Sequence, residues 1–334
     1  MSTRPTLHTL ARETGLSLAT VSRALGSSTQ VSFETRARVL AAARELGYSR
    51  DLTAVRLKTG RSMNLAYLMD PAAAQQTGFM QLLAGLSVAV RDSGYHLLVL
   101  PEPAERDSLD IVRYMLQRRL ADGAVLTHTT PQDERLKFLQ ERSFPFIAHG
   151  RTALPTPHAS VDFDNAAFAE KAVDCLVGRQ RRRLALILPR ANASYRDHLR
   201  EGFTRACLRN RVAGDSVEAI DLDSSPAEIN DWARPSLSAY DGLVLAGESP
   251  LLPLLGALSD LGRHPGHDLD IVLKYSSTLP CSLRIPLFVC HENLHQAGLS
   301  LGLSLLQMLA HPEAPPPQML FSPPTIETLH HANA

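Results

Sequence analysis

The chain has 334 residues, enough for a small domain together with one large or two medium domains. Its hydrophobic share of 44% is typical of a soluble globular protein, and no apolar run reaches the ~18 residues of a membrane-spanning helix. The N-terminus lacks the apolar core of an export signal, and the four cysteines show no paired spacing. We therefore expect a cytoplasmic protein with reduced cysteines and no membrane partner.

The formal net charge is zero, but the charge is unevenly distributed along the chain. Residues 1–61 contain ten Lys and Arg against four Asp and Glu, so this segment carries +6 and the remainder −6. A basic segment attached to a slightly acidic body suits contact with phosphates by one end of the molecule.

Residues 6–25 predict two short helices joined by a tight turn. Thr6 and Ser17 are suitable N-cap residues, and Gly15 stands where a left-handed turn residue is needed. Apolar residues recur at helical spacing on one face of each expected helix. Such a pair is either a helix-turn-helix, whose second helix lies in the DNA major groove, or an ordinary helical hairpin in a globular core.

A third helix is expected from Val31 onward, with Ser32 as its cap. The residues that carry a family likeness are Thr20-Val21-Ser22-Arg23, Val31-Ser32, Thr35-Arg36 and Leu46-Gly47-Tyr48. They closely resemble the DNA-binding headpiece of the lac-repressor (LacI/GalR) family of bacterial transcription regulators. The likeness runs without a gap over residues 6–48. It favours the helix-turn-helix and implies an all-α DNA-binding headpiece at residues 1–48.

The second helix carries the residues expected to contact DNA bases. By position within the motif these are Leu18, Ala19 and Arg23, and we expect Arg23 to make a bidentate contact to guanine. Phosphate contacts, which fix the register, are expected from the hydroxyl-bearing residues Thr6, Ser17, Thr20, Ser22 and Ser32. The resemblance implies a homodimer whose two headpieces read the half-sites of a pseudo-palindromic operator in double-stranded DNA.

Residues 49–61 form a polar linker that is too short to be a stable helix alone. In the resembled family this linker is a hinge that becomes helical on operator DNA and wedges a leucine into the minor groove. Leu57 stands at that position, with Ala54 three residues before it. Arg50-Asp51 replaces the Pro-Asn that is usual in the family. A solvated linker is the alternative interpretation.

From Asn64 onward, apolar runs of strand length alternate with amphipathic helical stretches. The expected strands are residues 64–69, 95–100, 123–127, 144–148, 159–162, 184–188, 217–221, 242–246, 270–274 and 286–290. The expected helices include residues 80–93, 108–120, 166–177 and 199–210. This alternation predicts parallel sheets covered on both faces, and so many strands predict two α/β lobes rather than one sheet.

The resemblance implies the same architecture for residues 62–334. The family's effector-binding and dimerisation domain is similar to periplasmic sugar-binding proteins of type I, in which the ligand lies between two lobes. By analogy, the first lobe holds about residues 62–158 and 290–318. The second lobe then holds residues 159–289 and 319–334.

Ligands of open α/β sheets bind beyond the carboxyl ends of the strands. The side chains expected to bind the effector there are Asp70, Phe79, His128, His149, Arg151, Arg196, Glu248, Lys274 and Tyr275. Each could equally be an ordinary polar residue of a loop. Two positions that commonly anchor a sugar in the family are Leu199 and Ser276 in this chain. An unusual or charged sugar derivative is therefore a candidate effector.

One motif points to a different class of protein. His291-Glu292-Asn293-Leu294-His295 spells the H-E-x-x-H signature of zinc hydrolases. The motif directly follows an expected strand, whereas a zinc protease carries it inside a long helix, and no nucleophile elbow or phosphate loop is present. A ligand-binding protein without DNA function is disfavoured by the headpiece. We therefore predict a transcriptional repressor under effector control, with no enzyme activity, cofactor or metal.

Overall fold

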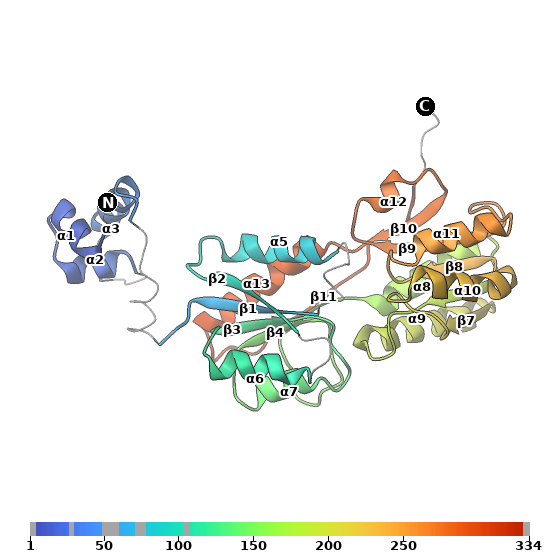
Figure 1. Cartoon of the computed structure of the whole chain (residues 1–334), viewed down its shortest axis with the longest axis horizontal. Helices are drawn as coiled ribbons and strands as arrows, with labels where there is room; N and C mark the ends of the chain where they lie inside the picture. The colour runs from blue at the N-terminus through green and yellow to red at the C-terminus, as the bar shows by residue number, and fades with distance from the viewer. Residues whose placement is uncertain (1–4, 27–29, 49–59, 71–77, 103–106, 330–334) are drawn as a thin grey trace. The chain divides into compact units, whose positions relative to one another are not determined.

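The computed structural model describes residues 5–26, 30–48, 60–70, 78–102 and 107–329 (Figure 1). The chain forms two compact units, Met1–Ser62 and Met63–Ala334, which are described separately below. Within the described residues, no helix combines the length and apolar character needed to cross a membrane.

The first unit is a three-helix headpiece with helices α1 (Leu7–Thr14), α2 (Leu18–Ala24) and α3 (Phe33–Glu45). Each helix starts at an N-cap, because the side-chain oxygens of Thr6, Ser17 and Ser32 accept a hydrogen bond from the backbone N–H three residues later. Gly15 ends α1 with φ of 64°, a left-handed conformation that glycine adopts without strain. The buried core is small and consists of Leu10, Val21, Ala24, Val39 and Ala43. The predicted helices and caps are confirmed.

The second unit contains two six-stranded sheets. The strands of the first sheet are β1 (Asn64–Met69), β2 (His96–Pro101), β3 (Gly123–Leu126), β4 (Phe146–His149), β5 (Ser160–Phe163) and β11 (Gln318–Phe321). They are all parallel and lie in the order β11-β5-β4-β3-β1-β2. One face packs on α5 (Gly78–Val90) and α13 (Leu294–Ala310). The other packs on α6 (Leu109–Gln117) and α7 (Glu134–Gln140).

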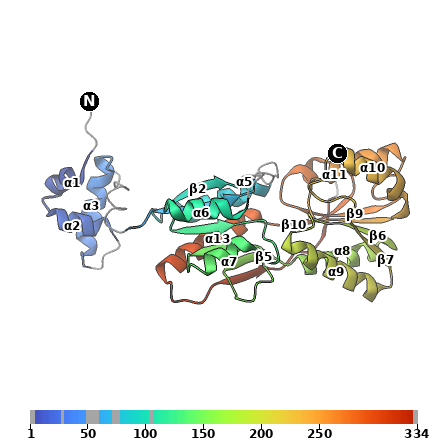
Figure 2. The same ribbon diagram turned by 60° about the horizontal axis from the view of Figure 1, so that its bottom comes forward.

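The second sheet repeats this arrangement. Its strands are β6 (Arg183–Ile187), β7 (Ala213–Val217), β8 (Gly242–Leu245), β9 (Asp270–Tyr275), β10 (Leu287–His291) and β12 (Glu327–Leu329). They lie in the order β12-β10-β9-β8-β6-β7, and β12 is antiparallel to β10. Helices α8 (Asn165–Gly178) and α9 (Ser194–Asn210) cover one face, and α10 (Pro226–Ser236) and α11 (Leu251–Asp260) cover the other (Figures 1 and 2). A 3₁₀ turn, Leu237–Ala239, and a short helix α12, Leu279–Ser282, complete this lobe.

The chain crosses between the lobes at positions that differ from the expected ones. Strand β5 was expected in the second lobe, but it pairs with β4 and β11 in the first sheet. The crossings therefore follow β5, β10 and β11. An apolar strand pattern shows that a strand is buried but carries no information about which sheet it joins, and this explains the error.

The other errors lie in edge strands. A strand expected at residues 217–221 is found at Ala213–Val217, and the strands β11 and β12 were not expected. Edge strands have only one neighbour, so they tolerate polar side chains, and β7 has the sequence Ala-Gly-Asp-Ser-Val with its first three residues exposed. The apolar signal that identifies central strands is therefore missing from them.

Candidate DNA-binding surface and interlobe site

Helix α2 separates buried from exposed side chains. Val21 and Ala24 are buried against the headpiece core, whereas Leu18, Ala19 and Arg23 are exposed together on the opposite face. Among the described residues, the Arg23 guanidinium has no hydrogen bond or ion pair. The residues expected to contact bases thus share one accessible face, and Arg23 is available to a ligand outside the chain.

The hydroxyl groups expected at phosphates have structural roles in the headpiece. Besides capping, the Oγ of Ser17 lies 2.8 Å from Oγ1 of Thr20, and the Oγ of Ser32 donates to Oγ1 of Thr35 at 2.9 Å. Thr6 forms a reciprocal capping box with Thr9, and Ser22 is half-buried. Any phosphate contact by these residues is additional to their role in starting the helices. The hinge residues Ala54 and Leu57, and Arg50-Asp51, lie outside the described residues.

Loops at the carboxyl ends of both sheets meet in what we call the interlobe region. Asp70, after β1, accepts a 2.5 Å hydrogen bond and ion pair from Arg190, after β6. The backbone N–H of Ser194, the first residue of α9, donates to the carbonyl oxygen of Thr129 at 2.9 Å. The Gln81 side chain of α5 donates to the carbonyl oxygen of Ser276. These polar contacts join the two lobes.

Lys274 lies in a closely packed polar and aromatic environment at the crossings. Its Nζ is 2.8 Å from Oε2 of Glu292 and 2.8 Å from Oδ1 of Asn165. The rings of Phe163 and Tyr195 lie within 5.3 Å of the same nitrogen. Burial acts to raise the pKa of Glu292, but the charge of Lys274 outweighs it and holds that pKa below its ordinary value. The ion pair to Glu292 and the hydrogen bond to Asn165 tie β9 to two of the crossing segments.

Two histidines, His128 after β3 and His149 at the end of β4, lie close together. Burial lowers the pKa of His128 to about 4, and the charges of Arg190 and His149 act in the same direction. Nδ1 of His128 is 3.1 Å from Oγ1 of Thr127. Its imidazole is therefore neutral near pH 7. His149 lies close enough to influence the pKa values of both His128 and Glu292.

Buried Arg135 fixes the loop that follows β3. Its guanidinium donates to the carbonyl oxygens of Thr127 at 3.1 Å and His128 at 3.2 Å. It also forms ion pairs with Asp133 and with Glu102, which follows β2. Burial raises the pKa of Glu102 above its ordinary value despite this pairing. The backbone beside His128 is thus held by a network within the first lobe.

Three of the expected effector-binding residues use their polar groups within their own lobe. Arg196 is buried and donates to the carbonyl oxygen of Pro189 and to Glu218. Glu248 accepts hydrogen bonds from Ser276 and Ser277, and Arg151 pairs with Asp162 at 2.7 Å. They shape the loops, but their charged groups are already engaged. Aromatic contacts place Phe79 5.8 Å from Tyr67, and Tyr275 5.0 Å from His291, between ring centroids.

The sequence analysis missed Arg190, Arg135 and Tyr195. Arg190 lies only three residues after the end of β6. The search for polar residues beyond the carboxyl ends of strands, which selected Asp70, should also have selected it. Arg135 and Tyr195 lie in the first turns of helices rather than at strand ends, and only the tertiary structure brings them to the interlobe region.

The H-E-x-x-H residues are not arranged as in a zinc protease. His291 ends β10, whereas His295 is in α13, so the two imidazoles do not belong to one helix. Glu292 is ion-paired with Lys274 and is not positioned as a free base. Within the part of the chain that the structure describes, no three His, Cys, Asp or Glu residues are grouped to hold a metal ion.

Two family models match this chain. Residues 6–51 match bacterial regulatory proteins of the lacI family. Residues 65–231, half of the chain, match periplasmic binding proteins and the sugar binding domain of the LacI family. The two matches correspond to the headpiece and to most of the two-lobed unit.

Individual relatives agree with these matches. The HTH-type transcriptional regulator AglR of Rhizobium meliloti (strain 1021) is 28% identical over 317 residues, which cover 90% of this chain and 86% of that protein. The HTH-type transcriptional regulator RafR of Escherichia coli is 33% identical over 205 residues, 60% of each chain.

Solved structures show the same fold. A complex of the transcriptional regulator CelR with cellobiose has a TM-score of 0.70 and 21% identity, and the similarity covers 98% of both chains. The lac repressor dimer bound to operator and the anti-inducer ONPF has a TM-score of 0.75 and 20% identity, over 97% of this chain and 98% of that one.

The fold defines a class of protein in which a helix-turn-helix headpiece is joined to a two-lobed sensor of the periplasmic-binding-protein type. Both parts match the same family over most of their lengths. The chain belongs to the lacI family of bacterial regulatory proteins, which are DNA-binding transcriptional regulators with a sugar-binding domain.

Proposed function

We propose that this chain is a sequence-specific transcriptional repressor whose DNA affinity is set by a carbohydrate bound in the interlobe region. The observation that carries the proposal is the exposed face of α2, where Leu18, Ala19 and Arg23 stand together and Arg23 is not engaged within the described residues. A helix of this kind reads base edges in the major groove, and an arginine suits the two acceptors of guanine.

The second part of the proposal concerns control by the effector. The loops from both sheets already contact each other through Asp70–Arg190 and Ser194–Thr129. A ligand held between them changes DNA binding only if it binds one arrangement of the lobes more tightly than another, with a coupling of typically ~1–3 kcal/mol. Action on chromosomal DNA implies a cytoplasmic location.

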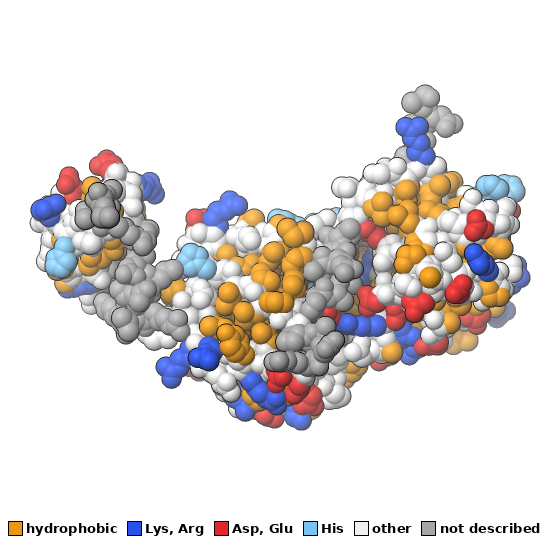
Figure 3. Space-filling view, viewed as in Figure 1, with side chains coloured by type: hydrophobic (Ala, Val, Ile, Leu, Met, Phe, Trp, Pro, Cys, Tyr) orange, Lys and Arg blue, Asp and Glu red, His pale blue; other side chains and the backbone are white. Residues whose placement is uncertain are grey.

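We further propose that the protein acts as a homodimer on a pseudo-palindromic operator. Large hydrophobic side chains are exposed on α5 (Met80 and Val88), on α11 (Leu252) and at the residue that caps α11 (Leu261). Figure 3 shows hydrophobic side chains gathered where α5 and α11 lie in Figure 1. Apolar patches of this kind are typical of subunit contacts.

The dimer is tested by sedimentation of the full-length protein. Met80→Arg places a charge in the patch and is expected to shift the protein from dimer to monomer by at least about tenfold in dissociation constant. Leu208→Arg is the matched control, because Leu208 is a single exposed leucine, 75% accessible, on α9. Equal behaviour of the two variants, or a monomeric parent protein, contradicts the proposed interface.

The function as a whole is tested by selecting bound duplexes from random DNA with the full-length protein near physiological salt. Recovery of a palindrome with half-sites about one helical turn apart supports the proposal. Failure to enrich any sequence, with and without pooled carbohydrates, refutes it. The recovered duplex then serves as the probe for carbohydrates that release or strengthen binding.

A further inference from the structure

The second lobe is rich in arginine at the end that lies away from the interlobe region. Strands β6 to β10 are parallel, so their amino ends lie together at this end of the sheet. The segments that hold these ends contain eight arginines and four aspartates, a net charge of +4 with neutral histidines; they are residues 178–184, 209–214, 240–242, 260–270 and 284–286. Residues 62–334 as a whole carry −6. A positive end on a negative unit is a feature that the fold alone does not require.

Four of these arginines hold the lobe together. Nε of Arg181 donates to Oδ2 of Asp270 at 2.8 Å, and Nε of Arg179 donates to the same oxygen at 3.3 Å. Arg263 donates to the carbonyl oxygens at both ends of the 3₁₀ turn and its cap. Arg209, in the last turn of α9, forms ion pairs with carboxylates of α8. The guanidinium groups of this set are therefore engaged within the chain.

The remaining four arginines of this end are exposed, and we call them the basic end: Arg182, Arg183, Arg211 and Arg284. Among the described residues, none of their guanidinium groups forms a hydrogen bond or an ion pair. Three of the four aspartates in the same segments accept hydrogen bonds within the chain, and Asp260 is the exposed exception. Four cations are thus set against one unengaged carboxylate.

Strand pairing places three members of the basic end side by side. Arg183 pairs with Ala213 of β7, and the N–H of Ala213 donates to the carbonyl oxygen of Arg182 at 3.0 Å. Arg211 stands two residues before Ala213. Oδ1 of Asp241 accepts hydrogen bonds from the backbone N–H groups of Arg182 and Arg183 at 2.9 and 2.8 Å, which fixes the backbone that carries them. Neighbouring strands lie ~4.8 Å apart, so the five strand ends from β10 to β7 span roughly 20 Å.

We propose that the basic end is a second DNA-binding surface, which holds the phosphate backbone of a duplex other than the one that α2 reads. Duplex DNA carries one negative charge per ~1.7 Å of its axis, so roughly 20 Å presents about a dozen phosphates. Guanidinium groups suit phosphates because their N–H groups donate in a bidentate way. Contacts of this kind carry no sequence information, so this surface binds any duplex.

The composition of the basic end favours duplex DNA over other polyanions. Arginine hot spots of protein interfaces occur together with tryptophan and tyrosine, and sites for single-stranded nucleic acid stack bases on aromatic rings. Among the described residues, the cation–π contacts involve other cations and none of these four arginines. The family to which the chain belongs binds DNA, so chromosomal DNA is the polyanion that surrounds the protein. A repressor bound through its headpiece would thereby bridge two segments of DNA.

The test asks whether protein bound to one duplex captures another. Full-length protein is bound to an excess of selected operator duplex on beads, or of random-sequence duplex if the selection yields none. Capture of a labelled duplex of about 40 bp and unrelated sequence is then measured between about 50 and 200 mM salt. We expect Arg182→Gln/Arg183→Gln/Arg211→Gln to reduce capture at least about tenfold. Its slope of log affinity against log salt should be shallower by ~2.7, because three phosphate contacts are lost.

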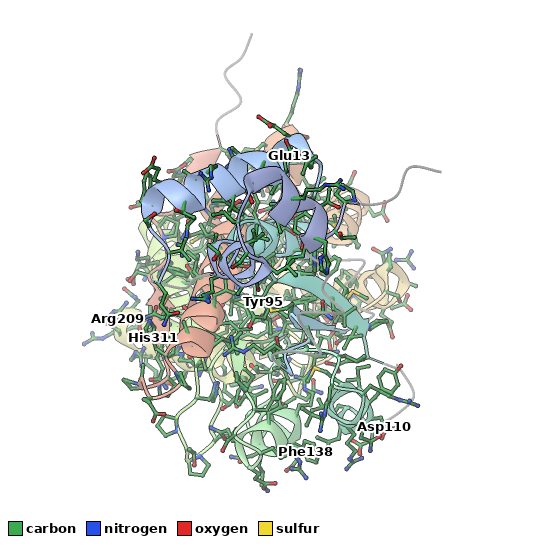
Figure 4. All side chains as sticks on the ribbon, turned by 90° about the vertical axis from the view of Figure 1, so that its left-hand side faces the viewer. Glu13, Tyr95, Asp110, Phe138, Arg209 and His311 are labelled. Atoms are coloured by element: carbon green, nitrogen blue, oxygen red, sulfur yellow. The ribbon has the colours of Figure 1, made fainter. Side chains whose placement is uncertain are left out.

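The matched control removes three cations around Phe138 on α7, which is labelled in Figure 4. The Cζ atoms of Arg113 and Arg142 lie 5.7 and 3.4 Å from the centroid of this ring, and Lys137 is the preceding residue. Arg113→Gln/Lys137→Gln/Arg142→Gln changes the net charge equally and should capture the second duplex as the unchanged protein does. Both variants should keep its affinity for the first duplex, which shows that the headpiece and the fold are intact.

Each outcome decides the proposal. Capture by the unchanged protein that only the first variant loses supports it. A second duplex that is not captured above background overturns it, and so does capture that both variants retain, because the headpieces then hold both duplexes. Equal loss in the two variants reports a general effect of charge and also overturns it. If poly-L-glutamate binds at the basic end while the duplex does not, the surface serves an acidic polypeptide and the proposal fails.

Discussion

The exposed face of α2 and the interlobe region use their cations in opposite ways. Arg23 is exposed and has no partner among the described residues, whereas Arg190 and Lys274 each contact a carboxylate. A polyanion such as DNA is attracted by charges that the protein leaves unbalanced. The cations of Arg190 and Lys274 are instead neutralised within the chain and hold segments of the two-lobed unit together. The same residue types therefore serve different partners, and their neighbours determine which.

The largest expected effect is at Lys274. Lys274→Met leaves the Glu292 carboxylate buried without its partner and should lower the free energy of unfolding by ~3–5 kcal/mol. Arg23→Met in the headpiece should change stability by no more than ~0.5 kcal/mol, since nothing in the described chain depends on it. Denaturant unfolding is followed by fluorescence of Trp232, the single tryptophan, for the second lobe and by circular dichroism for the helices of the headpiece.

The pH dependence sharpens this prediction. Lys274 holds the pKa of Glu292 below its ordinary value in the folded protein. The ion pair therefore stabilises the protein fully at a pH above the pKa that Glu292 has in the unfolded chain. This stabilisation is lost as the pH falls through the lower pKa that Glu292 has in the folded protein. In Lys274→Met the lone carboxylate prefers protonation. The difference in free energy of unfolding between the unchanged protein and Lys274→Met should therefore narrow as the pH falls from 7 to 4. A difference that does not change with pH contradicts the assigned ion pair. So does a double variant Lys274→Met/Glu292→Gln that is no more stable than Lys274→Met.

The next effect is on DNA specificity. Arg23→Ala should remove the preference for one guanine in each half-site, which is worth about 1–3 kcal/mol, and leave weak non-specific binding. The comparison variant is Arg44→Ala, which removes an equal charge from the last turn of α3 and should weaken binding to all sequences alike. Competition between duplexes that differ at the guanine gives the measurement. Unchanged base preference in Arg23→Ala would refute the assignment.

The third effect is the response to salt. DNA affinity should fall at least about tenfold between 50 and 200 mM salt, because basic headpiece side chains such as Arg23 release counterions from the phosphates. Affinity for an uncharged carbohydrate should change less than about twofold over the same range, because no net charge is neutralised. A similar salt dependence for DNA and for the carbohydrate would contradict the conclusion that the headpiece and the interlobe region use their cations differently.

The fold could be predicted where local chemistry decides it. Strand β1 falls at its expected residues 64–69 because a continuous apolar run identifies a central strand, and the caps Thr6, Ser17 and Ser32 are local motifs. The edge strand β7 was misplaced because exposure removes that signal. Lobe membership of β5 depends on pairing partners, which no local pattern encodes.

The candidate site shows the same division. The search at the carboxyl ends of strands selected Asp70 and Lys274, but their partners are distant in sequence. Arg190 is 120 residues from Asp70, and Asn165 is 109 residues from Lys274. An arginine that is paired with a carboxylate and an arginine that is unpaired look the same in the sequence. Whether an arginine is available to a ligand is thus a property of tertiary structure, and the sequence could identify the residues but not their pairing.

The hydrogen bond from Ser194 to Thr129 joins two main-chain atoms. Point substitutions that leave the backbone in place cannot remove it, so side chains around it can change during evolution while the lobes keep one fixed contact. An insertion in either loop would remove it. Diversification of effector preference in this scaffold should therefore proceed by substitution at constant loop length.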